Sequence, residues 1–529
     1  MKRHHKFRVL LFPLFGALAS CGGGGDSGGG NGGGNGGGNG GFPPATTTWQ
    51  TGVFQPSSNF DAKCVTPRPG TSDRLGTVTD QNNWLRSWTN ELYLWYGEVV
   101  DRDPAQFATA DYFELLKTSA LTGSGADKDK FHFVIPTDEW EALSQGGIEA
   151  GYGAEFAVLA PRPPRRIVVA YTESNTTAAT NLTRGDEILQ VDGADAVNGA
   201  GATVLNAGLF PGATGESHTF VVRNTAGVSR TVTMTSASIT HKPVPIVTTF
   251  DNGTVGYIQF NDHIATAEKQ LIDAVKTLNT AAVTDLILDL RYNGGGFLDL
   301  ASELAYMIGN TSMLTGKTFE KIVFNDKNPS RNPVTGEILA PTPFWDKSQG
   351  FPGTPIDTPL PTLNLLKLYV ITGSGTCSAS ESVINSLRGA GIQVFIIGST
   401  TCGKPYGFYP TDNCATTYFS IQFRGENNAN FGDYTDGFSP ANTTHGAGTS
   451  VAGCSVADDF NHPMGDATEG RIAAALAFRA SNNQTCPAAS GVSVPPQLRK
   501  ASLFGQLDGQ DSWVSKPVAR QNRIIRRTQ

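Results

Sequence analysis

From residue 254 onward, short apolar runs alternate with stretches of helical spacing, and this alternation restricts the fold more than any other feature of the chain. The runs have the length and the apolar content of buried strands. Strands that alternate with helices favour an α/β core with a largely parallel sheet, in which chemistry lies at the carboxyl ends of the strands. The predicted strands cover residues 255–260, 286–290, 368–371 and 394–397, with helices at 265–279, near 379 and at 466–479.

Three segments suited to catalysis follow these strands. Residues 289–296 read Asp-Leu-Arg-Tyr-Asn-Gly-Gly-Gly, and the glycines can present backbone amides that no side chain obstructs. The segment Thr-Cys-Ser-Ala-Ser-Glu places Ser378 on a turn at the start of a helix, and Gly-Ser-Thr-Thr-Cys-Gly-Lys places Lys404 on a loop. Because the ends of parallel strands meet at one edge of a sheet, the sequence predicts a nucleophile, a base and oxyanion donors in one place.

The chemistry sets conditions on such a pair. A serine hydroxyl becomes a good nucleophile when a base takes its proton, and a lysine is a base only when it is neutral. Burial must lower the pKa of the lysine from about 10.4 to roughly 7 or 8, which costs around 4 kcal/mol of folding free energy. One oxyanion donor contributes about 3 to 4 kcal/mol to transition-state stabilisation. Ser378 and Lys404 therefore form a candidate dyad for catalysis through an acyl-enzyme.

Between residues 146 and 238 the pattern changes to short β runs broken by Gly, Pro and Asn. Residues 151–156 resemble the carboxylate-binding loop of a PDZ domain, and residues 184–193 resemble the strand and turn that follow its short helix, here at 177–182. Successive amides in a Gly-rich turn bind anions, and the adjoining strand can pair with an extended peptide. The resemblance implies that unfolded or extended protein C-termini bind at Gly151, Tyr152, Gly153, Ala154 and Phe156.

The strand-end segments, taken in order, resemble those of the C-terminal processing peptidases, also called tail-specific proteases. The resemblance covers most of residues 80–480, including the PDZ-like insertion. It implies a serine endopeptidase with Ser378, the serine before Ala-Ser-Glu, as nucleophile and Lys404 as general base. It also implies that the oxyanion is held by the amide of Gly295 or Gly296 together with that of Ala379. No cofactor or metal is expected, and the sequence has neither Cys-x-x-Cys nor His-Glu-x-x-His.

Two positions depart from that family. The family often has Gln four residues after the lysine, where this chain has Phe408, and the Asp that some members carry eleven residues after the serine is Gly389 here. The orienting partner of Lys404 is therefore left open. A second interpretation is a catalytically inactive lipoprotein that binds peptides through its PDZ-like domain. A hydrolase of small esters is disfavoured because no Gly-x-Ser-x-Gly elbow lies between a predicted strand and helix, the match at residues 25–29 being part of the Gly-rich tether. Thiol chemistry at Cys377 is disfavoured because no His segment completes a Cys-His pair.

The first residues predict export. Residues 1–20 combine a basic start with an apolar run that is too short to span a bilayer, and the Leu-Ala-Ser-Cys that ends at Cys21 resembles the bacterial lipobox. The resemblance implies a lipid on Cys21 and a lipoprotein of the bacterial cell envelope, favouring the outer membrane and facing the periplasm or the cell surface. Fatty-acid labelling that is lost in Cys21→Ser checks this expectation. A plain secretory signal that contains a Cys is the alternative.

Net charge limits the classes of binding partner, and the cysteine content allows disulfides. The formal net charge is -7, and setting aside the nine cations of residues 1–20 and 516–529 leaves residues 21–515 at -16, which disfavours nucleic acid. For the basic end of the chain we expect a solvated, disordered segment. Outside the cytoplasm the cysteines of the mature chain can pair, and the sequence leaves the pairing open. They are Cys64, Cys377, Cys402, Cys414, Cys454 and Cys486.

These patterns divide the chain into six expected segments. The Gly/Asn repeats of residues 22–41 predict a flexible tether with a span of roughly 25 Å. The next segment should begin with a helix that Asp80 caps and Gly97 ends. The segments are a lipoprotein signal peptide (1–20), a Gly-rich tether (21–63), a small helical domain (64–140), a PDZ-like domain (146–238), a serine peptidase core (244–485, with a Pro-rich insertion at 325–362) and a C-terminal tail (486–529).

Overall fold

A computed structural model describes residues 49–444, 446–491 and 523–525, with the backbone alone for the last three. The predicted signal peptide, the predicted lipidation site Cys21, the Gly/Asn repeats and most of the tail lie outside the described residues. No helix within the described ranges has the length and apolar content to cross a membrane.

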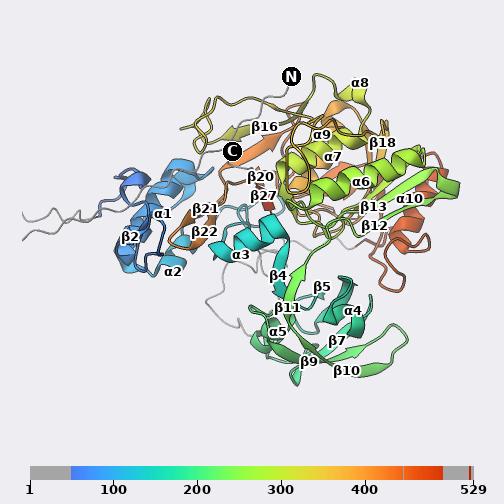
Figure 1. The fold of residues 1–529 in the computed structure, drawn as a ribbon, viewed down its shortest axis with the longest axis horizontal. Coiled ribbons are helices and arrows are strands. Elements are labelled where there is room, and N and C mark those ends of the chain that lie inside the picture. Colours follow the sequence, from blue (N-terminus) through green and yellow to red (C-terminus); the bar gives the residue numbers. More distant parts are fainter. Residues whose placement is uncertain (1–48, 445, 492–522, 526–529) are drawn as a thin grey trace, which may run out of the picture. The chain divides into compact units, whose positions relative to one another are not determined.

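A six-stranded sheet organises the core, in the order β12-β13-β14-β18-β19-β26. All its pairings are parallel except that of β12 with β13, so the predicted parallel α/β sheet is confirmed (Figure 1). Every residue of β13 and β14 is buried, as expected for strands covered on both faces. The strands are β12 (Ile246–Phe250), β13 (Val255–Gln259), β14 (Asp285–Asp289), β18 (Lys367–Thr372), β19 (Gln393–Gly398) and β26 (Gly453–Ser455).

Helices cover both faces of this sheet. Alternate strand residues such as Ile258 and Leu288 pack into the larger apolar core with α6, α7 and α9, whereas Tyr257 and Ile287 pack with α10 on the other face. The two layers fix the positions of the strand ends. The helices are α6 (Ala267–Thr280), α7 (Leu298–Ile308), α9 (Ala379–Ala390) and α10 (Gly470–Ala480), and the short α8 (Thr311–Leu314) follows α7.

A smaller antiparallel sheet beside the core contains the strand that follows the Lys404 loop. Its order is β17-β16-β23-β20, and β20 follows Lys404 by two residues. The Pro-rich insertion contributes β17 and otherwise consists largely of loops. The strands are β16 (Thr318–Phe324), β17 (Thr342–Pro343), β20 (Tyr406–Gly407) and β23 (Phe423–Glu426), and a separate parallel pair consists of β24 (Phe438–Pro440) and β25 (Thr449–Val451).

The PDZ-like region has an apolar core of its own, built around Phe156, Val191 and Phe220. Its main sheet runs β10-β9-β7-β6-β5, with β8 paired to β7. The chain enters through β4 and leaves through β11, and these two strands pair with each other (Figure 1). The elements are β4 (Ile148–Gly151), β5 (Ala154–Ala160), β6 (Arg166–Thr172), α4 (Thr177–Asn181), β7 (Glu187–Val191), β8 (Ala194–Asp195), α5 (Ala202–Leu209), β9 (Ser217–Arg223), β10 (Ser229–Thr235) and β11 (Ala237–Thr240).

The first described helix differs from the expectation at both ends. It begins at Val78 because Thr77 caps it, and Asp80 instead occupies the third helical position of a capping box. It ends at Leu92, before the predicted Gly97, where Tyr93 turns into an extended conformation. The elements of this region are β1 (Lys63–Cys64), β2 (Arg74–Leu75), α1 (Val78–Leu92), α2 (Thr109–Glu114), β3 (Phe133–Pro136) and α3 (Thr137–Glu141).

The helical region is joined to neighbouring segments on both sides. The Nη1 atom of Arg86 donates a hydrogen bond of 2.9 Å to the carbonyl of Val53, so the folded part already includes residues that we expected in the tether. The strand β3 pairs with β22 (Thr416–Phe419), which also pairs with β21 (Thr411–Asn413). The disulfide Cys64–Cys414 makes a second connection to this hairpin. These contacts join the residues on either side of positions 63 and 140.

Candidate active site

Ser378 lies where the sequence places it, on the turn between β18 and α9. Its φ of 64° and ψ of -118° are unusual for a residue other than glycine, and such backbone strain concentrates at functional sites. The residue is completely buried, and its Oγ has no hydrogen-bond partner among the described residues. A hydroxyl held on a sharp turn without a structural partner is available for chemistry.

A single carboxylate connects the Ser378 turn to the Lys404 loop. The Oε2 of Glu381 accepts hydrogen bonds from the amide of Ser378 at 2.9 Å and from the amide of Lys404 at 2.8 Å. Its Oε1 accepts from the amide of Gly403 at 2.8 Å and from the hydroxyl of Thr401. Burial raises the pKa of Glu381, while these hydrogen bonds oppose the rise. Because one oxygen atom binds both amides, the two predicted site residues are neighbours in space.

Lys404 is completely buried, and two aromatic rings contain its amine. The Nζ atom lies 4.1 Å from the ring centre of Phe408 and 4.8 Å from that of Phe131. The ring that replaces the family's Gln therefore packs directly on the amine. Burial raises the pKa of Asp129, and the hydrogen bonds that it accepts from the Tyr93 hydroxyl and the Phe131 amide oppose this rise. The lysine lies in the low-dielectric surroundings that a neutral amine requires.

The glycine turn after β14 is fixed by Asn293. The Oδ1 of Asn293 accepts from the amide of Gly295 at 2.9 Å, and its backbone carbonyl accepts from the amide of Cys377 at 3.1 Å. Of the two glycines predicted to supply an oxyanion donor, Gly295 therefore already has an acceptor within the turn. Gly296 has a φ of 145°, and a Cβ there would lie 2.3 Å from the carbonyl oxygen of His263, so only glycine fits. Ala379, the other predicted donor, is the first residue of α9.

His263 also belongs to this site, although the sequence analysis did not single it out. Its Nδ1 lies 2.9 Å from the Oδ1 of Asn293, and because that oxygen only accepts, Nδ1 carries the proton. Its Nε2 is buried with no hydrogen-bond partner among the described residues. Burial lowers the pKa of His263 to about 3, and the hydrogen bond to Asn293 opposes this shift. A neutral imidazole therefore lies beneath the glycine turn.

The six cysteines of the described chain form three disulfides. They are Cys64–Cys414, Cys377–Cys402 and Cys454–Cys486. The second bond joins the residue before Ser378 to the loop that carries Lys404, so it links the same two segments as Glu381 does. It also leaves Cys377 without a thiol for catalysis. Cys377, Cys402 and Glu381 lie close enough together to suggest a metal site, but the disulfide leaves no thiolate ligand.

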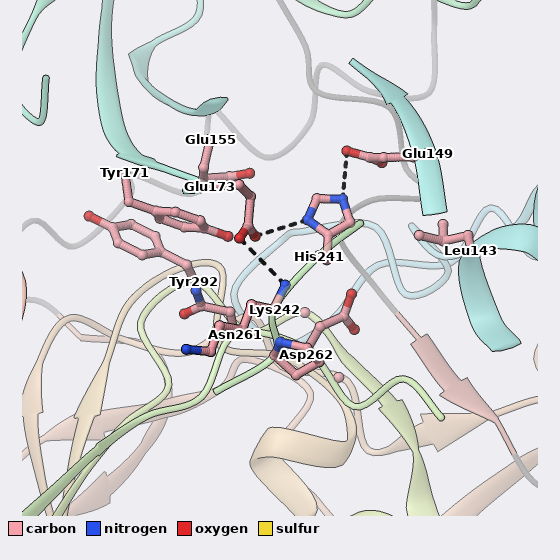
Figure 2. A pocket seen from close by; sticks show the side chains of 13 residues that line it. Leu143, Glu149, Glu155, Tyr171, Glu173, His241, Lys242, Asn261, Asp262 and Tyr292 are labelled. Atoms are coloured by element: carbon pink, nitrogen blue, oxygen red, sulfur yellow. Dashed lines mark hydrogen bonds and ion pairs between the residues drawn. The ribbon is translucent and has the colours of Figure 1, made fainter. Parts of the chain in front are cut away.

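A pocket separates the PDZ-like region from the glycine turn (Figure 2). Glu149 and Glu173 come from the PDZ-like side, whereas Tyr292 and Gly295 come from the core. His241 lies between the two glutamates, with its Nε2 2.9 Å from Glu149 and its Nδ1 3.1 Å from Glu173 (Figure 2). Burial disfavours the charged imidazole, but the two glutamates outweigh it and raise the pKa of His241 to about 10. His241 is therefore cationic at neutral pH and holds the two glutamates together where β11 ends.

The predicted peptide-binding residues divide into two groups. The side chains of Tyr152 and Phe156 are buried in the apolar core of the PDZ-like region, and the hydroxyl of Tyr152 donates to the carbonyl of Gly208. Gly153 has a φ of 79°, and a Cβ there would lie 2.5 Å from Thr176. Gly151 ends β4 and Ala154 begins β5. The loop thus has the tight glycine turn that was expected, while its aromatic side chains shape the domain.

Arg184 fastens the PDZ-like region to the core. Its guanidinium donates to the Tyr292 hydroxyl and to Asp458 Oδ1, both at 2.8 Å, and to the backbone carbonyls of Asp459 and His462. The Tyr292 hydroxyl in turn donates to Asp458 Oδ2 at 2.6 Å. Tyr292 directly precedes Asn293, so this arginine is connected to the glycine turn through two consecutive residues.

Comparisons with known proteins agree with this arrangement. Residues 254–408 match the model of peptidase family S41. The carboxyl-terminal-processing protease of Picosynechococcus sp. is 24% identical over 332 residues, which cover 62% of this chain and 69% of that protein. The chloroplastic carboxyl-terminal-processing peptidase 1 of Arabidopsis thaliana is 29% identical over 234 residues, which cover 42% of this chain and 40% of that protein.

A solved structure shares the fold. The crystal structure of a putative S41 protease from Bacteroides fragilis superposes with a TM-score of 0.55 at 21% identity and covers 76% of this chain and 98% of that one. The α/β fold and the family match define a serine-type peptidase. Within that class, the match of residues 254–408 to family S41 and the relatives named carboxyl-terminal-processing proteases support the C-terminal processing peptidase family.

Proposed function

We propose that this chain is an endopeptidase that cleaves proteins through an acyl-enzyme, with Ser378 as nucleophile and Lys404 as general base. The shared carboxylate of Glu381 carries the proposal, because it bonds the backbone of both residues through one oxygen atom. The Ser378 Oγ, which is buried and has no partner within the described ranges, and the buried amine of Lys404 support it.

In the proposed reaction, the Ser378 Oγ attacks the carbonyl carbon of the scissile peptide bond while its proton passes to the neutral amine of Lys404. The amides of Gly296 and Ala379 would stabilise the negative oxygen of the tetrahedral intermediate. The lysine ammonium then returns the proton to the leaving amine as the C–N bond breaks. Water, deprotonated by the same lysine, hydrolyses the ester and restores the Ser378 hydroxyl.

Acylation of the serine tests the proposal directly. We expect a fluorophosphonate probe to form one adduct, located at Ser378 by mass spectrometry, and we expect Ser378→Ala to lose both the adduct and the hydrolysis of an unfolded protein. Ser386→Ala is the matched control, since Ser386 lies on the same helix and its buried hydroxyl has no partner in the part of the chain that the structure describes. Absence of both the adduct and hydrolysis in the wild type would favour the alternative, a peptide-binding lipoprotein without catalytic activity.

We further propose that the PDZ-like region binds the C-termini of substrates and delivers the substrate polypeptide to the active site. We also propose that the protein is an envelope lipoprotein anchored through Cys21. A binding module raises the local concentration of its ligand only while it is held in a suitable position. Arg184→Ala removes the hydrogen bonds that hold this region to Tyr292 and Asp458. We expect kcat/KM for an unfolded protein to fall about tenfold, with a much smaller change for a short peptide that reaches the site unaided.

Arg223→Ala controls for the loss of a cation, because Arg223 is exposed on the same region and pairs with Glu187. Equal losses for protein and peptide substrates in Arg184→Ala would show that the arginine supports the fold of the site and has no part in delivery. If Arg184→Ala kept wild-type kinetics for both substrates, the proposed delivery of substrates by the PDZ-like region would be excluded.

A further inference from the structure

The last described strand of the chain lies against the glycine turn of the active site. Strand β27 (Arg523–Ile525) pairs in parallel with β15 (Gly295–Phe297), with Gly296 opposite Ile524. It also lies beside β20, which follows Lys404 in the chain (Figure 1). This part of the basic segment is therefore in the sheet next to the catalytic residues, where we expected a solvated end.

The hydrogen bonds of β15 indicate which of its groups this strand covers. On one edge, the amide of His263 donates to the carbonyl of Gly295 at 3.2 Å, and the amide of Phe297 donates to the carbonyl of His263 at 2.8 Å. Backbone groups of successive strand residues point to opposite edges, so the N–H and C=O of Gly296 face β27. The amide of Gly296 is the glycine donor available to an oxyanion, because that of Gly295 bonds to Asn293. A strand at this edge thus covers the group that the reaction needs.

An extended peptide suits this edge for a physical reason. A strand with one unpaired edge binds another strand through main-chain hydrogen bonds whatever the sequence of the added strand. Gly296 itself has no side chain that could hinder the approach of another backbone. Charge favours the occupant seen here, since residues 516–529 carry five cations and no acid while residues 21–515 carry a net charge of -16.

We propose that the free edge of β15 is the acceptor strand for an extended peptide in the active site, and that residues 523–525 of this chain are its resident occupant. The consequence for activity rests on the proposed peptidase function: the segment must leave before a substrate can pair with β15, so it acts as an intramolecular inhibitor.

Hydrogen exchange tests the docking without any need for activity. In a Ser378→Ala background, where the enzyme cannot cut its own tail, we expect the amide of Gly296 to exchange slowly in the full chain and faster in a variant that ends at Asn522, whereas those of Gly295 and Phe297, which bond to Asn293 and His263, should change little. The pair Ile524→Pro and Ile525→Pro removes two backbone donors and should exchange like the shortened variant. The pair Ile524→Val and Ile525→Val keeps both donors and should stay protected.

Two further measurements identify which segment occupies the edge of β15. A synthetic peptide of residues 520–529 should restore protection to the shortened variant, and protection in the full chain should not change on dilution. Equal exchange in all variants would overturn the proposal, and protection that disappears on dilution would assign the segment to a second copy of the chain.

Kinetics with the native Ser378 then measure the inhibition. A segment that occupies the edge about nine-tenths of the time leaves about a tenth of the enzyme open, so ending the chain at Asn522 should raise kcat/KM about tenfold. Protection of β15 without hydrolysis by any variant would leave the docking intact and refute the peptidase. Hydrolysis at equal rates by all variants, together with equal exchange, would refute the docking and leave the peptidase function intact.

Discussion

Replacing Lys404 by Met should lower kcat by about 10²- to 10⁴-fold, the usual contribution of a general base. Methionine keeps an unbranched apolar stem, so contacts with Phe131 and Phe408 can persist while the amine disappears. The free energy of unfolding should fall little, since the mutation removes a polar group from a buried site. Hydrolysis of an unfolded protein and urea unfolding, measured on the same preparation, separate the two effects.

The pH profile distinguishes this lysine from a structural one. Only the neutral amine can accept the Ser378 proton, so kcat should rise with pH through the pKa of Lys404. Lys321→Ala is the matched control, because Lys321 has a half-exposed side chain that pairs with Glu426. That variant should keep the wild-type rate and the wild-type profile.

His263 is a second candidate for the general base, and the same pH profile tests whether it has that role. Its pKa of about 3 makes it neutral throughout the usual pH range, so a histidine-driven reaction would show no rise between pH 5 and 9. A Lys404→Met enzyme with a wild-type rate and a flat profile would transfer the role of base to His263. We expect the opposite, because an imidazole with so low a pKa is a weak base.

The strand pattern predicted the position of the site, and local contacts determined its details. The apolar runs located β13, β14, β18 and β19, because strands buried on both faces leave a continuous apolar signal. Their order in a parallel sheet placed the Ser378 turn, the Lys404 loop and the glycine turn at one edge. Helix ends were less predictable, as the capping of α1 by Thr77 shows, since neighbouring polar residues compete for the same amides.

The partners of the candidate dyad depend on contacts between residues distant in sequence. Phe131 reaches Lys404 from a different segment of the chain. Comparison with the family, which often has Gln at the position of Phe408, did not predict that aromatic rings would enclose the amine. His263 likewise reaches the site by pairing with β15. Glu381 did leave a local signal, since Ser-x-x-Glu at a helix start is a capping-box pattern, but the pattern does not reveal that the same carboxylate binds Lys404.

Glu381→Gln should therefore disable the site even though the two side chains have nearly the same shape. The carboxylate only accepts hydrogen bonds, and all four of its N–H and O–H partners are donors. An amide NH₂ in place of Oε2 would face the amides of Ser378 and Lys404 and leave both buried without an acceptor. In place of Oε1 it would leave the amide of Gly403 without one, because the Thr401 hydroxyl can turn to accept. Each unsatisfied group costs about 1–3 kcal/mol, so we expect a loss of roughly 1–6 kcal/mol in the free energy of unfolding.

The loss of activity should exceed what partial unfolding explains. Separation of the Ser378 turn from the Lys404 loop by even about 1 Å lowers the rate about 100-fold, because proton transfer requires hydrogen-bond contact. Urea unfolding and kcat, both measured where the variant is still folded, test the two effects separately. Glu426→Gln is the control, since the buried Glu426 pairs with Lys321 and Arg424, whose side chains are about half exposed, so the cation that faces the new NH₂ can bind water instead. A Glu381→Gln enzyme with normal stability and normal kcat would show that this carboxylate does not hold the two loops together, and the disulfide Cys377–Cys402 would then have to do so alone.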